Sequence, residues 1–196
     1  MPGRPALAMS SALAGLVLLA AAAAADGLSP GKQTKAGLYL TAAEAAELLA
    51  DPAVVFIDVR SRSEVTFIGL PTRVDMHIPY MVMPMVPEYD PEAQGYKLEI
   101  NPDFPMVFEE FAEARKLSPD ARIVLMCRSG SRSAKAANLL YDMGFRNVYS
   151  VVDGFEGDKA KEGPFKGQRL VNGWKNAGLK WSYAIAPSQA YPDDRM

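Results

Sequence analysis

One thiol, that of Cys127, is the only cysteine side chain in this chain of 196 residues, and its neighbours determine what chemistry it can perform. It opens a segment with two arginines, three serines and one glycine: Cys127-Arg128-Ser129-Gly130-Ser131-Arg132-Ser133. An apolar run ends at Met126 and an Ala-rich stretch begins at Ser131, so the segment is expected to join a buried strand to the first turn of a helix. Backbone N–H groups at such a turn bind anions and favour a thiolate over a thiol, and guanidinium groups add a permanent positive charge. The spacing therefore predicts an anionic sulfur nucleophile rather than an inert core thiol.

The elements that must position this thiol can be read from the hydrophobic pattern. Three apolar runs rich in β-branched residues are predicted to be buried strands: 54–57, 122–126 and 148–152. Helices are predicted over 107–117 and 131–143, and a capping box at Thr41 and Glu44 predicts a short helix that reaches Ala50. Strands that alternate with helices predict an α/β fold with a parallel sheet. Cys127 is then expected at the carboxyl edge of the sheet, where open α/β sheets bind their ligands.

The Cys127 segment after a hydrophobic strand resembles the active-site loop of the rhodanese family of sulfurtransferases. Other pieces occur in the family's order: Phe56-Ile57-Asp58-Val59-Arg60, Glu64, Asp153-Gly154-Phe155-Glu156-Gly157 and Gly173-Trp174-Lys175-Asn176-Ala177-Gly178-Leu179. The resemblance covers about 40–181 and implies an exported, single-domain rhodanese-like protein, with a parallel sheet flanked by helices on both faces. In this family the cysteine takes sulfane sulfur from a donor such as thiosulfate, holds it as a persulfide and passes it to a thiophilic acceptor.

The resemblance also implies roles for individual residues. Cys127 is the expected catalytic residue, and the rest of its loop is expected to bind the donor and the persulfide: Arg128, Ser129, Gly130, Ser131, Arg132 and Ser133. Asp58, Arg60 and Glu64 are expected to give structural support. Neither a metal nor an organic cofactor is implied, and the expected partners are a small anionic sulfur donor and a thiol or protein acceptor. The 21 basic and 23 acidic side chains form no run of like charge, so no nucleic-acid surface is predicted.

The chain departs from the family pattern in three places. The usual Gly-His-Ile-Pro segment is replaced by Phe67-Ile68-Gly69-Leu70-Pro71, with His77 further along, and no role is transferred to that histidine. An insertion near 158–172 carries Phe165 and four cations: Lys159, Lys161, Lys166 and Arg169. It is expected to form either a basic rim beside Cys127 or a solvated surface loop. A Pro- and Met-rich insertion near 80–105 is expected to be mostly a long loop.

Other functions remain open from the residues alone. Cysteine phosphatases and arsenate reductases are the sharpest alternative, but phosphatases need five residues between cysteine and arginine, and the position so defined holds Ser133. A copper-binding protein is a second alternative, because Met81, Met83 and Met85 place three thioethers close together. A third is a non-catalytic carrier that delivers sulfur to one partner.

The first 25 residues predict a cleavable signal peptide. Arg4 precedes an uncharged stretch with an apolar centre from Leu13, and Ala23-Ala24-Ala25 before Asp26 are the small residues that signal peptidase accepts. The alternative is an uncleaved membrane anchor. We expect a mature protein that lies in a periplasm or is otherwise exported, with no stable membrane insertion. The predicted organisation is a signal peptide (1–25), a flexible lead-in (26–37), the rhodanese-like domain (38–181) and a C-terminal arm (182–196).

Overall fold

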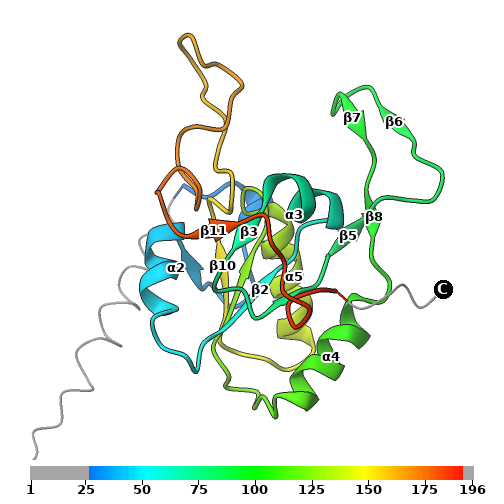
Figure 1. Cartoon of the computed structure of the whole chain (residues 1–196), viewed down its shortest axis with the longest axis vertical. Coiled ribbons are helices and arrows are strands. Elements are labelled where there is room, and N and C mark those ends of the chain that lie inside the picture. Colours follow the sequence, from blue (N-terminus) through cyan, green and yellow to red (C-terminus); the bar gives the residue numbers. More distant parts are fainter. Residues whose placement is uncertain (1–26, 192–196) are drawn as a thin grey trace, which may run out of the picture.

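A computed structural model describes residues 27–191, so the predicted signal peptide lies outside the described residues (Figure 1). A five-stranded sheet with the order β1-β10-β9-β2-β4 forms the centre, and every pair of neighbouring strands is parallel. Its strands are β1 (Tyr39–Leu40), β2 (Val55–Asp58), β4 (Met76–His77), β9 (Ile123–Met126) and β10 (Val148–Val151). The predicted α/β class and the three predicted strands are confirmed; the short outer strands β1 and β4 were not predicted.

The continuous apolar runs form strands that are buried on both faces. Ile57 and Leu125 face one hydrophobic cluster, which contains residues of α4 (Phe104–Ala114) and α5 (Ser131–Asp142). Phe56 and Val124, one position earlier on the same strands, face the other cluster, with residues of α2 (Ala42–Leu48) and α3 (Arg62–Ile68). Helices therefore cover both faces, as expected for a parallel sheet whose strands alternate their side chains.

The helix boundaries follow local capping chemistry. The Thr41 capping box begins α2 as predicted, and Ser61 and Glu64 form a second capping box that begins α3, a helix that the sequence analysis did not predict. The predicted helix 107–117 instead runs from Phe104 to Ala114. It starts earlier because a proline in its first turn is compatible with a helix N-terminus.

The insertion near 80–105 is mostly irregular, as predicted, but contains four two-residue strands that were not predicted. It forms an antiparallel ribbon in which β5 (Met81–Val82) pairs with β8 (Glu99–Ile100) and β6 (Tyr89–Asp90) pairs with β7 (Gly95–Tyr96). The Asp90 carboxylate accepts backbone hydrogen bonds in the turn at its tip. The 158–172 insertion forms a second projection from the same end of the molecule (orange in Figure 1).

Both terminal segments are docked on the domain. Lys35 of the lead-in bonds to Asn138 and Asp142 of α5, so residues 27–37 differ from the expected flexible segment. At the other end, β11 (Trp181–Ser182) pairs antiparallel with β3 (Leu70–Pro71), and the backbone N–H of His77 donates to the Gln189 carbonyl. Residues 182–191 therefore fold back over the sheet edge rather than extend as a free arm. Within residues 27–191, no helix is both long enough and apolar enough to cross a membrane.

Candidate active site

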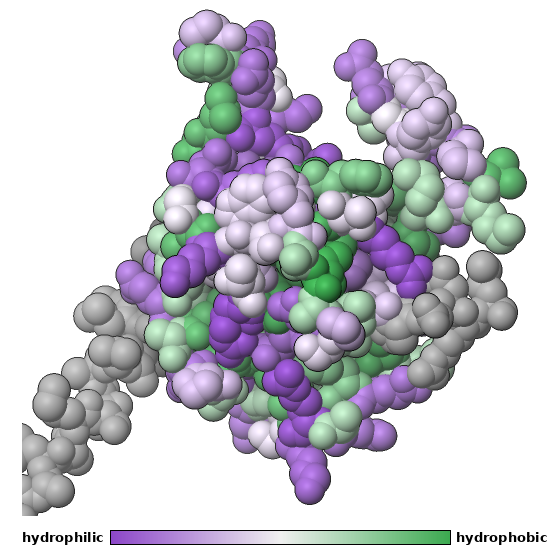
Figure 2. All heavy atoms as spheres, in the orientation of Figure 1, coloured by the Kyte–Doolittle hydropathy of each residue, from purple (hydrophilic) through white to green (hydrophobic). Residues whose placement is uncertain are grey.

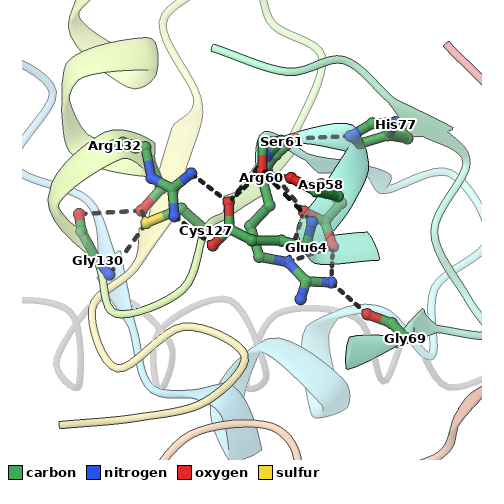
Figure 3. Close-up of polar contacts among 11 residues, drawn as sticks. Asp58, Arg60, Ser61, Glu64, Gly69, His77, Cys127, Gly130 and Arg132 are labelled. Atoms are coloured by element: carbon green, nitrogen blue, oxygen red, sulfur yellow. Dashed lines mark hydrogen bonds and ion pairs between the residues drawn. The ribbon is translucent and has the colours of Figure 1, made fainter. Parts of the chain in front are cut away.

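Cys127 directly follows β9 and lies at the carboxyl edge of the sheet, as predicted (Figure 3). The residue is almost fully buried, with 1% of its surface exposed. The backbone N–H of Gly130 donates a hydrogen bond to its Sγ at 3.2 Å, and the Ser133 Oγ lies 3.6 Å from the same sulfur. A hydrogen-bond donor is thus already aimed at the buried sulfur.

The conformation of Gly130 makes this donor possible. Its φ of 99° lies in the left-handed region, and a Cβ atom there would stand 2.2 Å from the Val152 carbonyl oxygen. The turn also starts α5 at Ser131, so the first N–H groups of that helix have no intrahelical partners. Together with the helix dipole, these groups favour negative charge at Cys127 and on any atom bound above it.

Buried hydroxyl groups lie beneath the loop. Ser133 Oγ donates to the Gly130 carbonyl at 3.0 Å and accepts from Ser150 Oγ at 3.0 Å. Ser133 has one hydroxyl proton, so it can donate to Sγ of a negatively charged sulfur only by turning that proton away from the Gly130 carbonyl. Sequence reasoning missed Ser150; the available signal was a serine within the largely apolar run 148–152.

Arg132 is paired with Glu64, a residue that the sequence analysis assigned to structural support. Both terminal nitrogens of Arg132 donate to the Glu64 carboxylate at 2.6 Å (Figure 3). Glu64 also accepts from the backbone N–H and hydroxyl of Ser61 at the start of α3. Burial opposes ionisation of Glu64, but Arg132 and Ser61 nevertheless lower its pKa to about 2. The pair therefore links α3 to the first turn of α5. Because the Glu64 carboxylate balances the charge of Arg132, we regard Arg132 as a residue that positions the loop.

Arg128 has a different environment. Its side chain is exposed and, within the described part of the chain, forms no ion pair or hydrogen bond. Its backbone carbonyl accepts from the Glu156 N–H at 3.0 Å, and the carbonyl of Cys127 accepts from the Phe155 N–H at 2.8 Å. The turn after β10 thus supports the loop from below and leaves the Arg128 guanidinium available to an anion. Of the other predicted loop residues, Ser129 is half-buried and Ser131 is exposed.

Asp58, Arg60 and His77 form a buried cluster beside the site. Arg60 Nη2 donates to Asp58 Oδ2 at 2.6 Å and to the Gly69 carbonyl at 2.7 Å. The Arg60 guanidinium carbon lies 4.0 Å from the centre of the Phe155 ring. His77 Nε2 lies 2.6 Å from the Arg60 carbonyl; burial lowers the pKa of His77, so a neutral ring donates this bond. The contacts of this cluster fix the segment between β2 and α3, and none of them reaches Cys127.

The three methionines considered for copper occupy different environments. Met81 packs against the core cluster beneath α4, whereas Met83 and Met85 are exposed on the ribbon. In the described residues, no group of three or more His, Cys, Asp or Glu side chains could hold a metal ion.

Comparison with known proteins agrees with this geometry. The family model described as "Rhodanese-like domain" matches residues 41–161. An uncharacterized protein of Rickettsia conorii is 27% identical over 136 residues, which are 69% of this chain and 89% of the relative. A tRNA uridine(34) hydroxylase of Synechococcus elongatus is 28% identical over 65% of this chain, but that match spans 38% of the hydroxylase. The crystal structure of Rv0390 from M. tuberculosis has a TM-score of 0.53 and 29% identity, covering 74% of this chain and 97% of that one.

Proposed function

Because the chain belongs to the rhodanese-like domain family, we propose that it is a sulfurtransferase that carries sulfane sulfur as a persulfide on Cys127. The observation that carries this proposal is the Gly130 N–H, which donates to Sγ at the N-terminus of α5. A hydrogen-bond donor aimed at a sulfur, combined with helix N–H groups above it, stabilises a thiolate before the reaction and a terminal persulfide anion after it.

The proposed reaction has two steps. The Cys127 thiolate attacks the outer sulfur of a donor such as thiosulfate; a new S–S bond forms, the donor's S–S bond breaks, and sulfite leaves with the electron pair. An acceptor such as cyanide or a thiolate then attacks the terminal sulfur of the persulfide and restores the Cys127 thiolate. No metal or organic cofactor takes part in either step.

The burial of Cys127 is compatible with these two transfer steps. With 1% of the residue exposed, its sulfur is accessible to the terminal atom of a small donor rather than to a bulky group. A persulfide places the transferable sulfur about 2 Å beyond Sγ, nearer to the solvent and to an acceptor. The acceptor therefore need not reach Sγ itself, and a small thiol or a protein thiol would serve.

The phosphatase and arsenate reductase alternatives are less well supported by the same loop. Four residues separate Cys127 from Arg132, and the Arg132 guanidinium is neutralised by Glu64. A phosphoryl group needs an arginine free to bind its oxygens in the transition state. A non-catalytic carrier uses the same persulfide chemistry and differs in needing one specific partner for turnover.

We further propose that the protein acts after export to a periplasm or an equivalent space. The proposal rests on the signal-like pattern of residues 1–25.

The direct test is mass spectrometry of the purified protein before and after thiosulfate treatment. The wild type is expected to gain one sulfur atom on Cys127 and to lose it to cyanide with formation of thiocyanate, whereas Cys127→Ser does neither. Hydrolysis of an aryl phosphate without any sulfur transfer would contradict the proposal. Persulfide formation without turnover to cyanide or small thiols would instead identify a dedicated carrier.

A further inference from the structure

We propose that Arg169, from the 158–172 insertion, forms with Arg128 a subsite that binds the anionic oxygens of the sulfur donor and of the departing sulfite. This inference rests on the proposed sulfur transfer and names the donor class: small dianions whose charge lies next to the transferred sulfur. It also assigns to Arg169 the positive charge beside Cys127 that the sequence suggested only for the 158–172 insertion as a whole.

The backbone brings Arg169 to the Cys127 loop. The turn after β10 lies against that loop, with the Glu156 N–H donating to the Arg128 carbonyl at 3.0 Å. The adjacent Gly157 carbonyl accepts a hydrogen bond from Arg169 Nη1. The Arg169 guanidinium is therefore anchored one residue beyond the residue that bonds to Arg128. An antiparallel bridge between Lys159 and Arg169 pairs the two sides of the insertion at this point.

The electrostatic environment is consistent with this position. Burial and the nearby Arg128 guanidinium lower the pKa of Arg169. Glu156, Asp158 and Cys127 act in the opposite direction, so Arg169 lies within electrostatic range of both the loop arginine and the reactive sulfur.

Two cations lie near the carboxylates and the sulfur at this end of the sheet. Asp158 is paired with Lys32 at 2.9 Å, so that carboxylate is already neutralised. Two guanidinium groups, those of Arg128 and Arg169, then act together with the carboxylate of Glu156 and the Cys127 sulfur. Guanidinium groups bind the oxygens of oxyanions through paired N–H donors, which makes the two arginines suitable for a sulfonate or sulfite group.

The other cations of the insertion have different surroundings. Lys159 and Lys161 line an open pocket of about 800 Å³ together with Lys32 of the lead-in. Lys166 lies in the turn at the far end of the insertion, where its N–H donates to the Gly163 carbonyl. Figure 2 shows the insertion as a projection with hydrophilic residues along one side and hydrophobic residues along the other. Of the four cations, Arg169 is the one whose side-chain hydrogen bond joins it to the turn beside the Cys127 loop.

The test compares Arg169→Gln with a matched control in which Lys159, Lys161 and Lys166 are all changed to Gln. We expect kcat/KM for thiosulfate to fall about 10- to 100-fold in Arg169→Gln, the effect of losing a charge-assisted hydrogen bond. The triple variant, despite losing three charges, should stay within about twofold of the wild type at moderate salt. Arg169→Lys should recover part of the loss, because it restores the charge without the paired donors. The loss should be smaller with benzenethiosulfonate, a monoanionic donor.

A second measurement does not depend on turnover. Sulfite binding to Cys127→Ser, followed by titration calorimetry, should weaken by a similar factor when Arg169→Gln is added, and should not change in the triple-lysine background. Equal sulfite affinity with and without Arg169 would overturn the inference, as would an unchanged kcat/KM in a folded Arg169→Gln protein. Absence of sulfur transfer in the wild type would instead refute the proposed function, and the sulfite titration would still decide whether the subsite exists.

Discussion

The carboxylate of Glu64 and the guanidinium of Arg132 meet in a two-point ion pair, with both N···O distances at 2.6 Å, although the residues are 68 positions apart in the chain. Glu64 also completes the capping box of α3, so one carboxylate stabilises the start of that helix and holds the first turn of α5. This ion pair sets the position of the loop that carries Cys127.

Glu64→Gln should destabilise the protein by about 3 kcal/mol at neutral pH, because it leaves the Arg132 charge without its partner in a largely buried site. Sulfur transfer should fall with it, since the loop loses its support from α3. The control is Glu88→Gln, which breaks an exposed pair with Lys97 on the ribbon and should cost less than about 1 kcal/mol. Denaturant unfolding of the two variants measures the difference; equal costs would contradict a structural role for the Glu64–Arg132 pair.

The same pair predicts an acid limit for stability. The pKa of Glu64 is lowered from 4.5 to about 2 in the folded protein, so its contribution is complete above about pH 4.5 and is lost as the pH falls toward 2. In the wild type this contribution to the free energy of unfolding is expected to disappear over that interval. Glu64→Gln should lack it, so the two stability curves should converge as the pH falls from 4.5 to 2. Parallel curves would show that Glu64 does not titrate in this way.

Gly130→Ala should disable the loop through backbone strain and through a steric clash. The residue has φ of 99°, and the added Cβ would stand 2.2 Å from the Val152 carbonyl oxygen. Gly144→Ala is the matched control: its φ is 105°, but a Cβ there has open space around it. We expect Gly144→Ala to lose about 1–2 kcal/mol of stability with normal sulfur transfer. Gly130→Ala should lose more stability, together with most persulfide formation. Normal persulfide formation in Gly130→Ala would contradict the need for the tight left-handed turn that aims the backbone N–H of residue 130 at the sulfur.

Ser133→Ala removes the hydroxyl that lies 3.6 Å from Sγ and leaves the Ser150 hydroxyl without its acceptor. We expect a loss of about 1–3 kcal/mol in stability and a several-fold slower sulfur transfer, because the hydroxyl no longer stabilises the charged sulfur. Ser150→Ala should change stability by a similar amount but affect transfer less, since Ser133 retains its bond to the Gly130 carbonyl. Steady-state kinetics of both variants and of the double variant separates the two effects. An equal loss of transfer in both single variants would contradict direct contact of Ser133 with the sulfur.

The export proposal is tested by the N-terminus of the native protein. We expect the mature chain to begin at or near Asp26 and to be recovered from the exported fraction, because Ala23-Ala24-Ala25 provide a cleavage site. Replacing Ala23 and Ala25 with bulky residues should prevent cleavage. A native protein that retains Met1, or one that sediments with membranes, would contradict the proposal.

The sequence alone was sufficient to predict the parallel α/β fold, the location of Cys127 at a strand end and the helix that follows it. These features depend on apolar runs, capping residues and glycines within a few positions of one another, so local chemistry determines them. The same local signal, Ser61 followed by Glu64, was present for α3 but was not used. Local patterns could not assign the partner of Arg132, because any carboxylate in the chain was a candidate until the helices packed.

Tertiary structure decided the contacts that cross the chain. It placed Ser150 under Ser133, docked the two terminal segments on the domain, and paired the strands of the 81–100 ribbon, whose two-residue strands are too short to leave a clear periodic pattern. It also distinguished Arg169 from the three lysines of its insertion, which composition treats as equivalent. These outcomes depend on long-range contacts, because residues far apart in sequence interact only after the sheet and its helices have brought them together.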